Sequence, residues 1–561
     1  MTAFPTNKTE ATAQKRRGGY YTPIALADYL VRWAIRSGDE RILEPSCGDG
    51  NFIEAALKRI GEVKRNTNVG PAQICVTEID AGELKKAQSR ARNCGAERAD
   101  ISWRCGDFFE LYADLLAEER YDVVVGNPPF IRFQYFAAAS RDTAFGHLRA
   151  AGYRPTKLAN AWAAFVQLSV ELLKKGGRLA MVLPAELLQV GYAGQLRDRI
   201  TAVFDHVVLV GFDELVFPEI QQEVVLLLAE GKRTSTDRVS DIHTLQLRNG
   251  KALLELWSLG ETVRHLPVKH SRKSMKWTSL FLTSEAFDAL DSVERLKGIK
   301  KLGDYAQVDV GVVTGRNSFF VMDTEQVEKL KVNGSMVSVV GRTSALKSII
   351  FSNEDLRECA IRFPSWLLNL KGVEKADISP ELLEYIRAGE EKKVHEGYKC
   401  RIRPRWFDVP SVYAPDAFLF RQIHKAPFLV ANRANAVSTD TIHRVRVYAG
   451  IDIDVLCAAS INSLTFAWAE VCGRSYGGGV LELEPREAEE LPIPYENADA
   501  LDIEKVDHHL RAQQLDIALD YTDSVLLRDG LGFDKAMIKY IRAAWSELRD
   551  RRRNRRYSGT A

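Results

Sequence analysis

The sequence lacks several features that define specialised classes of protein. Its eight cysteines form no C-x-x-C pair and no cluster with histidine at the spacing of metal ligands. This argues against a zinc site and a disulfide framework, and it fits the reducing cytosol. The first 19 residues are polar and basic without a signal-peptide core, and apolar runs such as VVLLLA (224–229) are too short to span a bilayer. We therefore expect a cytoplasmic protein with no metal and no membrane partner.

A strong net charge is also absent. The 77 basic and 75 acidic residues leave +2, so the whole chain has no electrostatic signature of nucleic-acid binding. Charge is nevertheless uneven: residues 399–446 contain nine Lys or Arg against three Asp, a net of +6, and RDRRRNRR (549–556) contains six Arg and one Asp. Such runs predict either a solvated surface or a surface that contacts nucleic acid.

The first 230 residues or so alternate short apolar runs with amphipathic segments. Segments 51–60 and 161–175 have helical periodicity, and Gly176–Gly177 would end the second. This alternation predicts an α/β fold with a Rossmann-like parallel sheet covered on both faces, to which the last run adds an antiparallel strand. The seven predicted strands are 41–45, 74–80, 101–109, 121–130, 178–184, 206–212 and 223–231.

The periodicity changes further along the chain. After about residue 265 the pattern becomes irregular, with short strand-like pieces, turns and Arg–aromatic mixtures such as RIRPRWFDVP (401–410). Residues 501–550 have the pattern of amphipathic helices. We expect a Rossmann-like domain at 1–265, a mixed α/β domain at 266–500, and a helical segment with a basic tail at 501–561.

Polar residues follow the first four predicted strands. Ligands of doubly wound sheets bind outside the carboxyl ends of the strands, so these residues are expected to form one site. The four strand ends are Glu44-Pro45-Ser46-Cys47-Gly48-Asp49-Gly50, Glu78-Ile79-Asp80, Asp107-Phe108-Phe109 and Asn127-Pro128-Pro129-Phe130.

The first three strand ends favour a nucleoside ligand. The turn at 48–50 lacks the third glycine of a dinucleotide site, so a smaller, net-cationic nucleoside suits the carboxylates better. Glu78 could hold ribose hydroxyls, Asp107 could accept from an adenine amino group, and Ile79 and Phe108 could enclose its ring. S-adenosylmethionine has this chemistry. The alternative is that the carboxylates only cap helices.

The fourth strand end has groups that could activate an amino nitrogen. A nucleobase amino group is a poor nucleophile because its lone pair is delocalised into the ring. If the side-chain oxygen of Asn127 and the rigid carbonyl of Pro128 each accept one N–H bond, the nitrogen is drawn toward tetrahedral geometry. Phe130 would stack on the base, which must leave the duplex to reach the pocket. The ordinary alternative is a strand stop followed by a turn.

Together these motifs resemble the gamma-class DNA adenine-N6 methyltransferases of the TaqI type, found in restriction–modification systems. The resemblance covers nearly the whole chain and keeps the family's order: YYTP (20–23), LEPSCGDG (43–50), VTEID (76–80), GDFF (106–109), NPPF (127–130), AAFVQ (163–167), LVFPEIQQEVV (215–225) and VGVVTGRNSFFVM (310–322). It implies a bacterial enzyme that methylates adenine N6 of a flipped-out base in duplex DNA. The cofactor would be S-adenosylmethionine, bound in 1–265, with a target-recognition domain at 266–500.

The resemblance also implies roles for individual residues. Asn127, Pro128, Pro129 and Phe130 would hold the target adenine, and Phe217 would stack on its other face. Contacts to the cofactor are implied for Tyr21, Thr22, Glu44, Ser46, Cys47, Gly48, Glu78, Ile79, Asp107, Phe108 and Phe165.

The basic, aromatic-rich second domain predicts the DNA contacts. We expect a DNA cleft that faces the NPPF pocket, with the glycines at 477–479 allowing the backbone to approach the duplex closely. The residues expected to line it are Arg316, Asn317, Arg401, Arg403, Arg405, Trp406, Arg474 and Tyr476. A monomer is expected, and a cognate restriction endonuclease would be a separate protein, because no P-D-x(n)-E-x-K pattern in a strand context indicates a fused nuclease.

Several alternatives stay open. NPPF also occurs in methyltransferases of RNA guanine or of a protein glutamine amide, but those chains need no large specificity domain. Cytosine-N4 DNA methyltransferases more often have Ser at the position of Asn127. From another class, the chain could be a catalytically inert DNA-binding protein with a cofactor fold, against which the intact strand-end acids argue.

Overall fold

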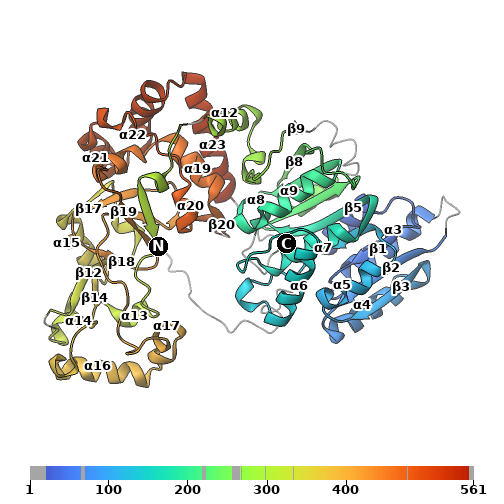
Figure 1. Cartoon of the computed structure of the whole chain (residues 1–561), viewed down its shortest axis with the longest axis horizontal. Coiled ribbons are helices and arrows are strands. Elements are labelled where there is room, and N and C mark those ends of the chain that lie inside the picture. The colour runs from blue at the N-terminus through green and yellow to red at the C-terminus, as the bar shows by residue number, and fades with distance from the viewer. Residues whose placement is uncertain are drawn as a thin grey trace. The chain divides into compact units, whose positions relative to one another are not determined.

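The computed structural model describes residues 21–64, 70–217, 223–255, 266, 268–296, 298–332, 334–476 and 478–554. The chain divides into two compact units, drawn in Figure 1. The first runs to Ser284 and also contains Ser475–Gly479 and the residues from Arg551. The second contains Glu285–Arg474 and Val480–Asp550, so the helical segment that follows residue 501 belongs mainly to it.

A single twisted sheet organises the first unit. Its order is β3-β2-β1-β4-β5-β7-β6-β8-β9, with β7 antiparallel to both β5 and β6. The predicted α/β sheet and its antiparallel strand are confirmed, and β8 and β9 extend it beyond the seven expected strands. The strands are β1 (Arg41–Glu44), β2 (Ala72–Glu78), β3 (Ala99–Cys105), β4 (Tyr121–Gly126), β5 (Leu173–Pro184), β6 (His206–Phe212), β7 (Val224–Glu230), β8 (Ile242–Leu247) and β9 (Val268–Lys269).

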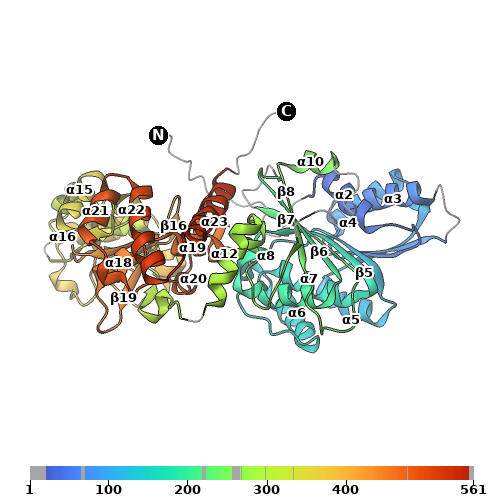
Figure 2. The ribbon, with the colours of Figure 1, turned by 90° about the horizontal axis from the view of Figure 1, so that it is seen from above.

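Helices cover both faces of this sheet, as Figure 2 shows. Side chains alternate along a strand, so Val123 and Val125 of β4 face one way and pack in one core with α2, α3 and α4. Val124 points to the other face, where α5 and α7 lie (Figure 2). The helices are α2 (Ile24–Ala34), α3 (Asn51–Lys64), α4 (Ala81–Asn93), α5 (Phe108–Ala117), α6 (Ala138–Ala150), α7 (Ala161–Leu172), α8 (Glu186–Gln189), α9 (Gly194–Val203) and α10 (Gly250–Glu255).

The helix predicted for 161–175 ends earlier, at Leu172, because the chain enters β5 directly at Leu173. The ammonium of Lys232 donates to the carbonyls of Val170, Glu171 and Leu173, and so satisfies this helix end. Burial lowers the pKa of Lys232 to about 8. Gly176–Gly177 therefore lies within the strand rather than after the helix.

The second unit is mixed α/β with a helical end, as the sequence predicts. A five-stranded sheet has the order β10-β19-β15-β17-β13, and a four-stranded sheet has the order β11-β14-β12-β18. The shorter strands of these sheets are β10 (Ala306–Asp309), β11 (Val321–Met322), β13 (Ile350–Phe351), β14 (Trp366–Leu368) and β18 (Val437–Ser438). Its other elements include α12 (Ser284–Arg295), β12 (Met336–Val340), α15 (Asn353–Arg362), α16 (Pro380–Glu391), α17 (Tyr398–Arg401), β15 (Ala417–Phe420), β17 (Leu429–Asn432), β19 (Ile442–Val447), α18 (Ile453–Ala459), α19 (Ser463–Cys472), α21 (Ile503–Arg511), α22 (Leu515–Thr522) and α23 (Lys535–Arg553).

No single helix in the described parts is long and apolar enough to cross a bilayer, although α18 and α19, bent by 77°, pass that test as a pair.

The basic tail is partly structural. Arg551 pairs with Glu223 (N···O 3.1 Å) and lies over the ring of Phe281, while Arg552 is buried and donates to the carbonyl of Gly479. All of these residues belong to the first unit. These two arginines therefore hold protein groups, and the rest of the tail from residue 555 lies outside the described residues.

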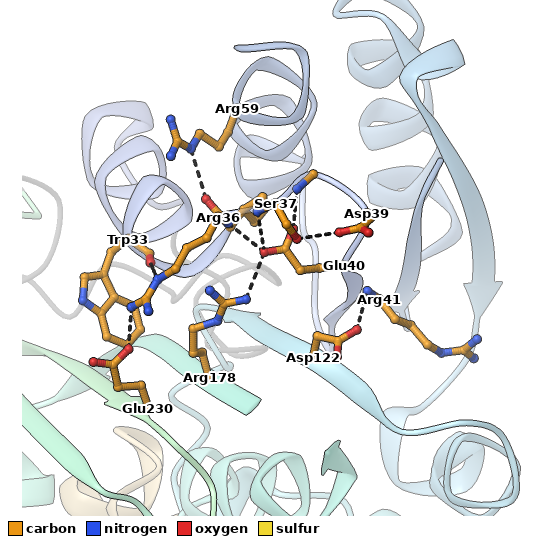
Figure 3. Close-up of polar contacts among 12 residues, drawn as sticks. Trp33, Arg36, Ser37, Asp39, Glu40, Arg41, Arg59, Asp122, Arg178 and Glu230 are labelled. Atoms are coloured by element: carbon orange, nitrogen blue, oxygen red, sulfur yellow. Dashed lines mark hydrogen bonds and ion pairs between the residues drawn. The ribbon is translucent and has the colours of Figure 1, made fainter. Parts of the chain in front are cut away.

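A buried carboxylate joins the strands at the amino edge of the sheet. Glu40, immediately before β1, accepts from the N–H groups of Arg36, Ser37 and Gly38 and pairs with Arg178 of β5 (N···O 2.9 Å), as Figure 3 shows. Burial alone would raise the pKa of Glu40, but these donors outweigh it and hold the pKa below its ordinary value. The network fixes where β1 begins relative to β5.

Replacement of Glu40 by Gln tests this network. We expect Glu40→Gln to lower the free energy of unfolding by about 2–3 kcal/mol at pH 7, because Arg178 loses its ionic partner. Since folding lowers the pKa of Glu40, its contribution is complete above the unfolded-state pKa of about 4.3 and disappears as the pH falls through the folded-state value. Urea denaturation of the full chain between about pH 3 and pH 7 measures the difference.

The matched control is Glu119→Gln, which removes the exposed partner of Lys174 and should leave the unfolding curve unchanged. Equal stability of the natural chain and Glu40→Gln at pH 7 would contradict the stabilising role of the Glu40 network.

Candidate functional site

The carboxyl ends of β2, β1 and β4 meet at one edge of the sheet, where hydrogen bonds join them. The N–H of Gly48 donates to Glu78 (N···O 2.9 Å), which ties the turn after β1 to the end of β2. On the other side, the hydroxyl of Ser46 donates to the carbonyl of Asn127 (3.3 Å). The turn after β1 thus connects the carboxylate and the NPPF segment.

Glu44 is the most unusual group at this edge. Its side chain is 1% exposed, and neither carboxylate oxygen has a hydrogen-bond partner within the described part of the chain. Burial raises the pKa of Glu44 well above its usual range, and the nearby charges of Glu78 and Asp49 raise it further. A buried acceptor without a donor is costly, so this site suits a ligand that brings donors or positive charge.

The two glycines of the turn have separate physical roles. Both have positive φ, 52° at Gly48 and 93° at Gly50. A Cβ at Gly50 would lie 2.8 Å from Cα of Ala87, so a side chain there would push α4 away from the turn. The G-x-G spacing therefore serves close packing of helix against turn as well as backbone conformation.

The other strand-end carboxylates are hydrogen-bonded within the protein. Glu78 also accepts from the N–H of Asp80 (2.9 Å), and Asp80 in turn caps α4. Asp107 caps α5 by accepting from the N–H of Phe109 (2.9 Å). Helix capping, weighed as an alternative, is therefore one role of Asp107. Next to Glu78, the side chain of Ile79 is 64% exposed and open to a ligand.

Aromatic side chains lie beneath this edge. The rings of Phe108 and Phe165 stack at 4.9 Å, and both side chains are buried. Phe130 is half-buried against the sheet core, and Phe217 is 3% exposed within that same core. In this structure Phe108 and Phe217 are core aromatics, and no described contact tests their expected roles toward a cofactor or a base.

The segment before α2 closes the site from the amino-terminal side. Thr22 is buried, and its carbonyl accepts from the side-chain amide of Asn51 (2.8 Å) at the start of α3. Tyr21 donates to Glu83 (2.9 Å), and its ring lies 3.8 Å from the position of a Cβ on Gly48. Asn51 was not predicted from the sequence, because its only signal is one polar side chain at the start of a helix.

The NPPF segment is held at both ends. The side-chain oxygen of Asn127 is buried, and among the described residues no hydrogen bond to the Pro128 carbonyl is found. After the motif, the carbonyl of Ile131 accepts from Ala161 N–H (3.0 Å), and the side-chain oxygen of Asn160 accepts from Phe133 N–H (2.9 Å). Asn160 is a second residue missed from the sequence, because its signal is one polar side chain before a helix.

In the second unit the predicted DNA-contacting residues separate into two groups. Arg403 donates to the carbonyls of Val313 (2.9 Å) and Thr314 (2.8 Å). Arg405 is bonded to Asp408 and to the carbonyls at 370 and 373, and Trp406 packs on Phe319 and donates to Glu390. These three side chains hold the unit together. The structural contacts of these three side chains therefore compete with the DNA contacts expected of them.

The remaining predicted residues are more accessible. Arg316 and Arg401 are exposed and form no ion pair with other described residues, and Asn317 donates to Asp440 (3.2 Å). Arg474 pairs with Glu487 (2.9 Å), and Tyr476 is 38% exposed. Gly477 lies outside the described residues, as do Tyr20 and residues 218–222 after Phe217. No group of three or more potential metal ligands is found in the described parts.

Two family models match this chain. Residues 6–252 match N-6 DNA Methylase, and residues 274–527 match the C-terminal domain of the type II methyltransferase M.Eco57I. Residues 6–252 therefore belong to the N-6 DNA methylase family. The gamma-class resemblance predicted from the order of the motifs is confirmed, and the methylase is a DNA methyltransferase of the type II restriction–modification class.

Relatives and solved structures match most of the methylase. M.AccI of Acinetobacter calcoaceticus is 20% identical over 494 residues, 84% of each chain. M.XamI of Xanthomonas campestris pv. amaranthicola is 24% identical over 493 residues, 85% of each. The type IIL restriction–modification enzyme MmeI, solved in complex with DNA, has a TM-score of 0.58 at 12% identity and covers 94% of this chain and 75% of its own. The DrdV–DNA complex has a TM-score of 0.51 at 12% identity, covering 89% and 57%.

The raised pKa of Glu44 makes a prediction opposite in sign to that for Glu40. A carboxyl whose pKa is raised by folding destabilises the folded state at pH values above its unfolded pKa of about 4.3. We expect Glu44→Gln to make the methylase more stable by roughly 1–3 kcal/mol at pH 7, with the gain fading below about pH 4. Thermal unfolding across this pH range measures it, and Glu40→Gln is the matched comparison. Lower stability of Glu44→Gln at pH 7 would mean that Glu44 is charged and paired.

Proposed function

We propose that the methylase transfers a methyl group from S-adenosylmethionine to N6 of an adenine flipped out of a specific sequence in duplex DNA. Such an activity would protect host DNA in a restriction–modification system. One observation carries the proposal: the turn after β1 joins Glu44, a buried carboxylate with no hydrogen-bond partner among the described residues, to the NPPF segment through the Ser46–Asn127 hydrogen bond. Glu44, which can bind a cation, and the NPPF segment, which can hold an amine, thus lie at the same edge of the sheet and are connected by hydrogen bonds.

The residues at this edge fit S-adenosylmethionine. Its sulfonium and ammonium groups are cationic. The oxygens of Glu44, for which the described part of the chain supplies no donor, offer acceptors to a cationic ligand. Glu78 and the exposed Ile79 would contact its nucleoside, with Asp107, Ser46, Cys47, Gly48, Tyr21, Thr22 and Phe165 as further implied neighbours. When bound, S-adenosylmethionine supplies an electrophilic methyl group on sulfur.

The protein would prepare the amine. The Asn127 side-chain oxygen and the Pro128 carbonyl would each accept one N–H of the adenine amino group, which concentrates the lone pair on nitrogen. Because Pro128 and Pro129 fix the backbone, the acceptors need no reorganisation during the reaction. Phe130 would stack on the base outside the duplex. Asn at this position, where cytosine-N4 enzymes more often have Ser, favours adenine.

DNA binding is supported by fold and by charge. MmeI and DrdV, which share this fold, were solved with DNA. In the second unit, exposed Arg316, Lys399 and Arg401 are close in space, since a Cβ on Gly315 would lie 3.1 Å from Cβ of Lys399. These cations, rather than Arg403 and Arg405, are the proposed DNA contacts. A monomer and a separate endonuclease stay predictions.

The catalytic assignment is tested by Asn127→Ala. We expect methyl transfer to fall by at least about a hundredfold, because loss of one preorganised hydrogen-bond partner costs roughly that much. The dissociation constant for S-adenosylmethionine should change little. Transfer of labelled methyl to duplex DNA, with chromatography of the released nucleosides, measures the rate and separates N6-methyladenine from N4-methylcytosine.

Glu78→Ala is the matched control for Asn127→Ala, because it should weaken cofactor binding while leaving the adenine site intact. Full transfer activity in Asn127→Ala would contradict the catalytic role. If the product were N4-methylcytosine, the protein would be a cytosine-N4 methyltransferase and the adenine assignment would be wrong.

The two groups of arginines make separate predictions. Arg401→Ala should weaken duplex binding by about 1–3 kcal/mol without changing stability. Arg405→Ala should instead lower the unfolding free energy by about 1–2 kcal/mol, because two backbone carbonyls and Asp408 lose their donor. Fluorescence anisotropy with duplex DNA and thermal unfolding measure the two effects. If Arg405→Ala weakened only DNA binding and left stability unchanged, the division into DNA-contacting and structural arginines would be wrong.

A further inference from the structure

The segment after NPPF is the most basic part of the first unit near the site. Residues 131–158 contain five Lys or Arg against one Asp, a net of +4 in a chain whose total is +2. Four of these cations are exposed: Arg132, Arg149, Arg154 and Lys157. None of the four forms an ion pair within the described residues. Neither the cofactor site nor the adenine acceptors use this segment.

Hydrogen bonds and packing hold its beginning in place. Ala161, at the start of α7, donates to the carbonyl of Ile131. Asn160 accepts from the N–H of Phe133, and its own amide donates to Glu186 after β5 (2.9 Å). Phe136 is buried, with its ring 5.5 Å from that of Phe109. The turn at 132–135 is therefore fixed on both sides, directly after Phe130.

This fixed turn exposes aromatic rings to solvent. Tyr135 is 62% exposed and Phe133 is 36% exposed, and Leu158, two residues before Asn160, is 62% exposed. Arg132, just before Phe133, and Gln134, between Phe133 and Tyr135, are also exposed. Ordered apolar surface next to cations is unusual for a soluble surface and typical of a binding site. Interleaved cations and aromatics are the groups that bind phosphates and bases.

We propose that this basic aromatic turn, residues 132–135 with Lys157 and Leu158, binds the DNA strand beside the target base. Tyr135 stacks on an adjacent nucleotide, while Arg132 and Lys157 contact phosphates. The inference rests on the proposed function. It adds a DNA-binding surface on the methyltransferase unit. This surface lies close to the NPPF segment because only Ile131 separates Arg132 from Phe130. Asn160 acts as the positioning residue that keeps the turn attached to α7.

The test compares single variants of the full chain with matched controls. Tyr135→Ala should raise the dissociation constant for duplex DNA about tenfold, and Tyr135→Phe should retain natural affinity because the stacking ring is kept. Arg132→Ala should reduce the slope of log affinity against log salt by about 0.9, the value for one phosphate contact. The controls are Val239→Ala and Arg238→Ala, exposed residues just before β8 at the amino edge of the sheet. Binding of S-adenosylmethionine should be unchanged in all five.

The outcomes separate the two hypotheses. If Tyr135→Ala and Arg132→Ala bind DNA like their controls while the natural chain methylates adenine, the turn has no role in DNA binding and the proposed function stands. If the natural chain methylates no DNA, the proposed function fails, and the affinity and salt-slope comparisons still test the turn. Weaker binding of S-adenosylmethionine in Tyr135→Ala would assign the residue to the cofactor site instead and overturn the proposal.

Discussion

The energetic constraint on this structure is the burial of a carboxylate at each end of β1. Three residues separate Glu40 from Glu44, and both are almost fully buried. Glu40 has three backbone donors and a guanidinium, whereas Glu44 has no hydrogen-bond partner among the described residues. Burial of a carboxyl group without partners is unfavourable, so the fold must be stable enough elsewhere to retain Glu44. The network at the amino edge contributes this stability, and it leaves the opposite edge available for chemistry.

The same constraint explains why the site depends on the whole sheet. The turn after β1 bonds to Glu78 at the end of β2 and to the backbone of Asn127 after β4, so its position depends on the register of three strands. Gly50 allows α4 to approach the turn within van der Waals contact. A shift of any of these strands would separate the carboxylate from the NPPF segment. This rigidity is what a mechanism based on fixed hydrogen-bond acceptors requires.

The second unit shows how similar side chains acquire different roles. Arg401, Arg403 and Arg405 are separated by single residues and are chemically identical. Arg403 and Arg405 turn inward to backbone carbonyls left unsatisfied by loops, whereas Arg401 extends into solvent. Buried carbonyls need donors, and guanidinium groups with five N–H bonds can serve several at once. Local charge density therefore overestimates the number of residues available to DNA.

Much of the architecture was determined by the sequence itself. Strand–helix alternation predicted the sheet, its antiparallel strand and the helical end, because hydrophobic periodicity is local and each element needs one apolar face. Strand-end acids and NPPF predicted the edge where a site would form, because parallel strands deliver their carboxyl ends together. Tertiary structure decided what the sequence pattern cannot encode. It decided that Glu44 lacks a hydrogen-bond partner among the described residues while Glu40 has four, and that α7 ends at Leu172. It also decided that Asn160 fixes the segment after NPPF and that Arg405 is structural. Each of these depends on which distant backbone group comes within hydrogen-bonding distance, and that is settled only when the strands have packed.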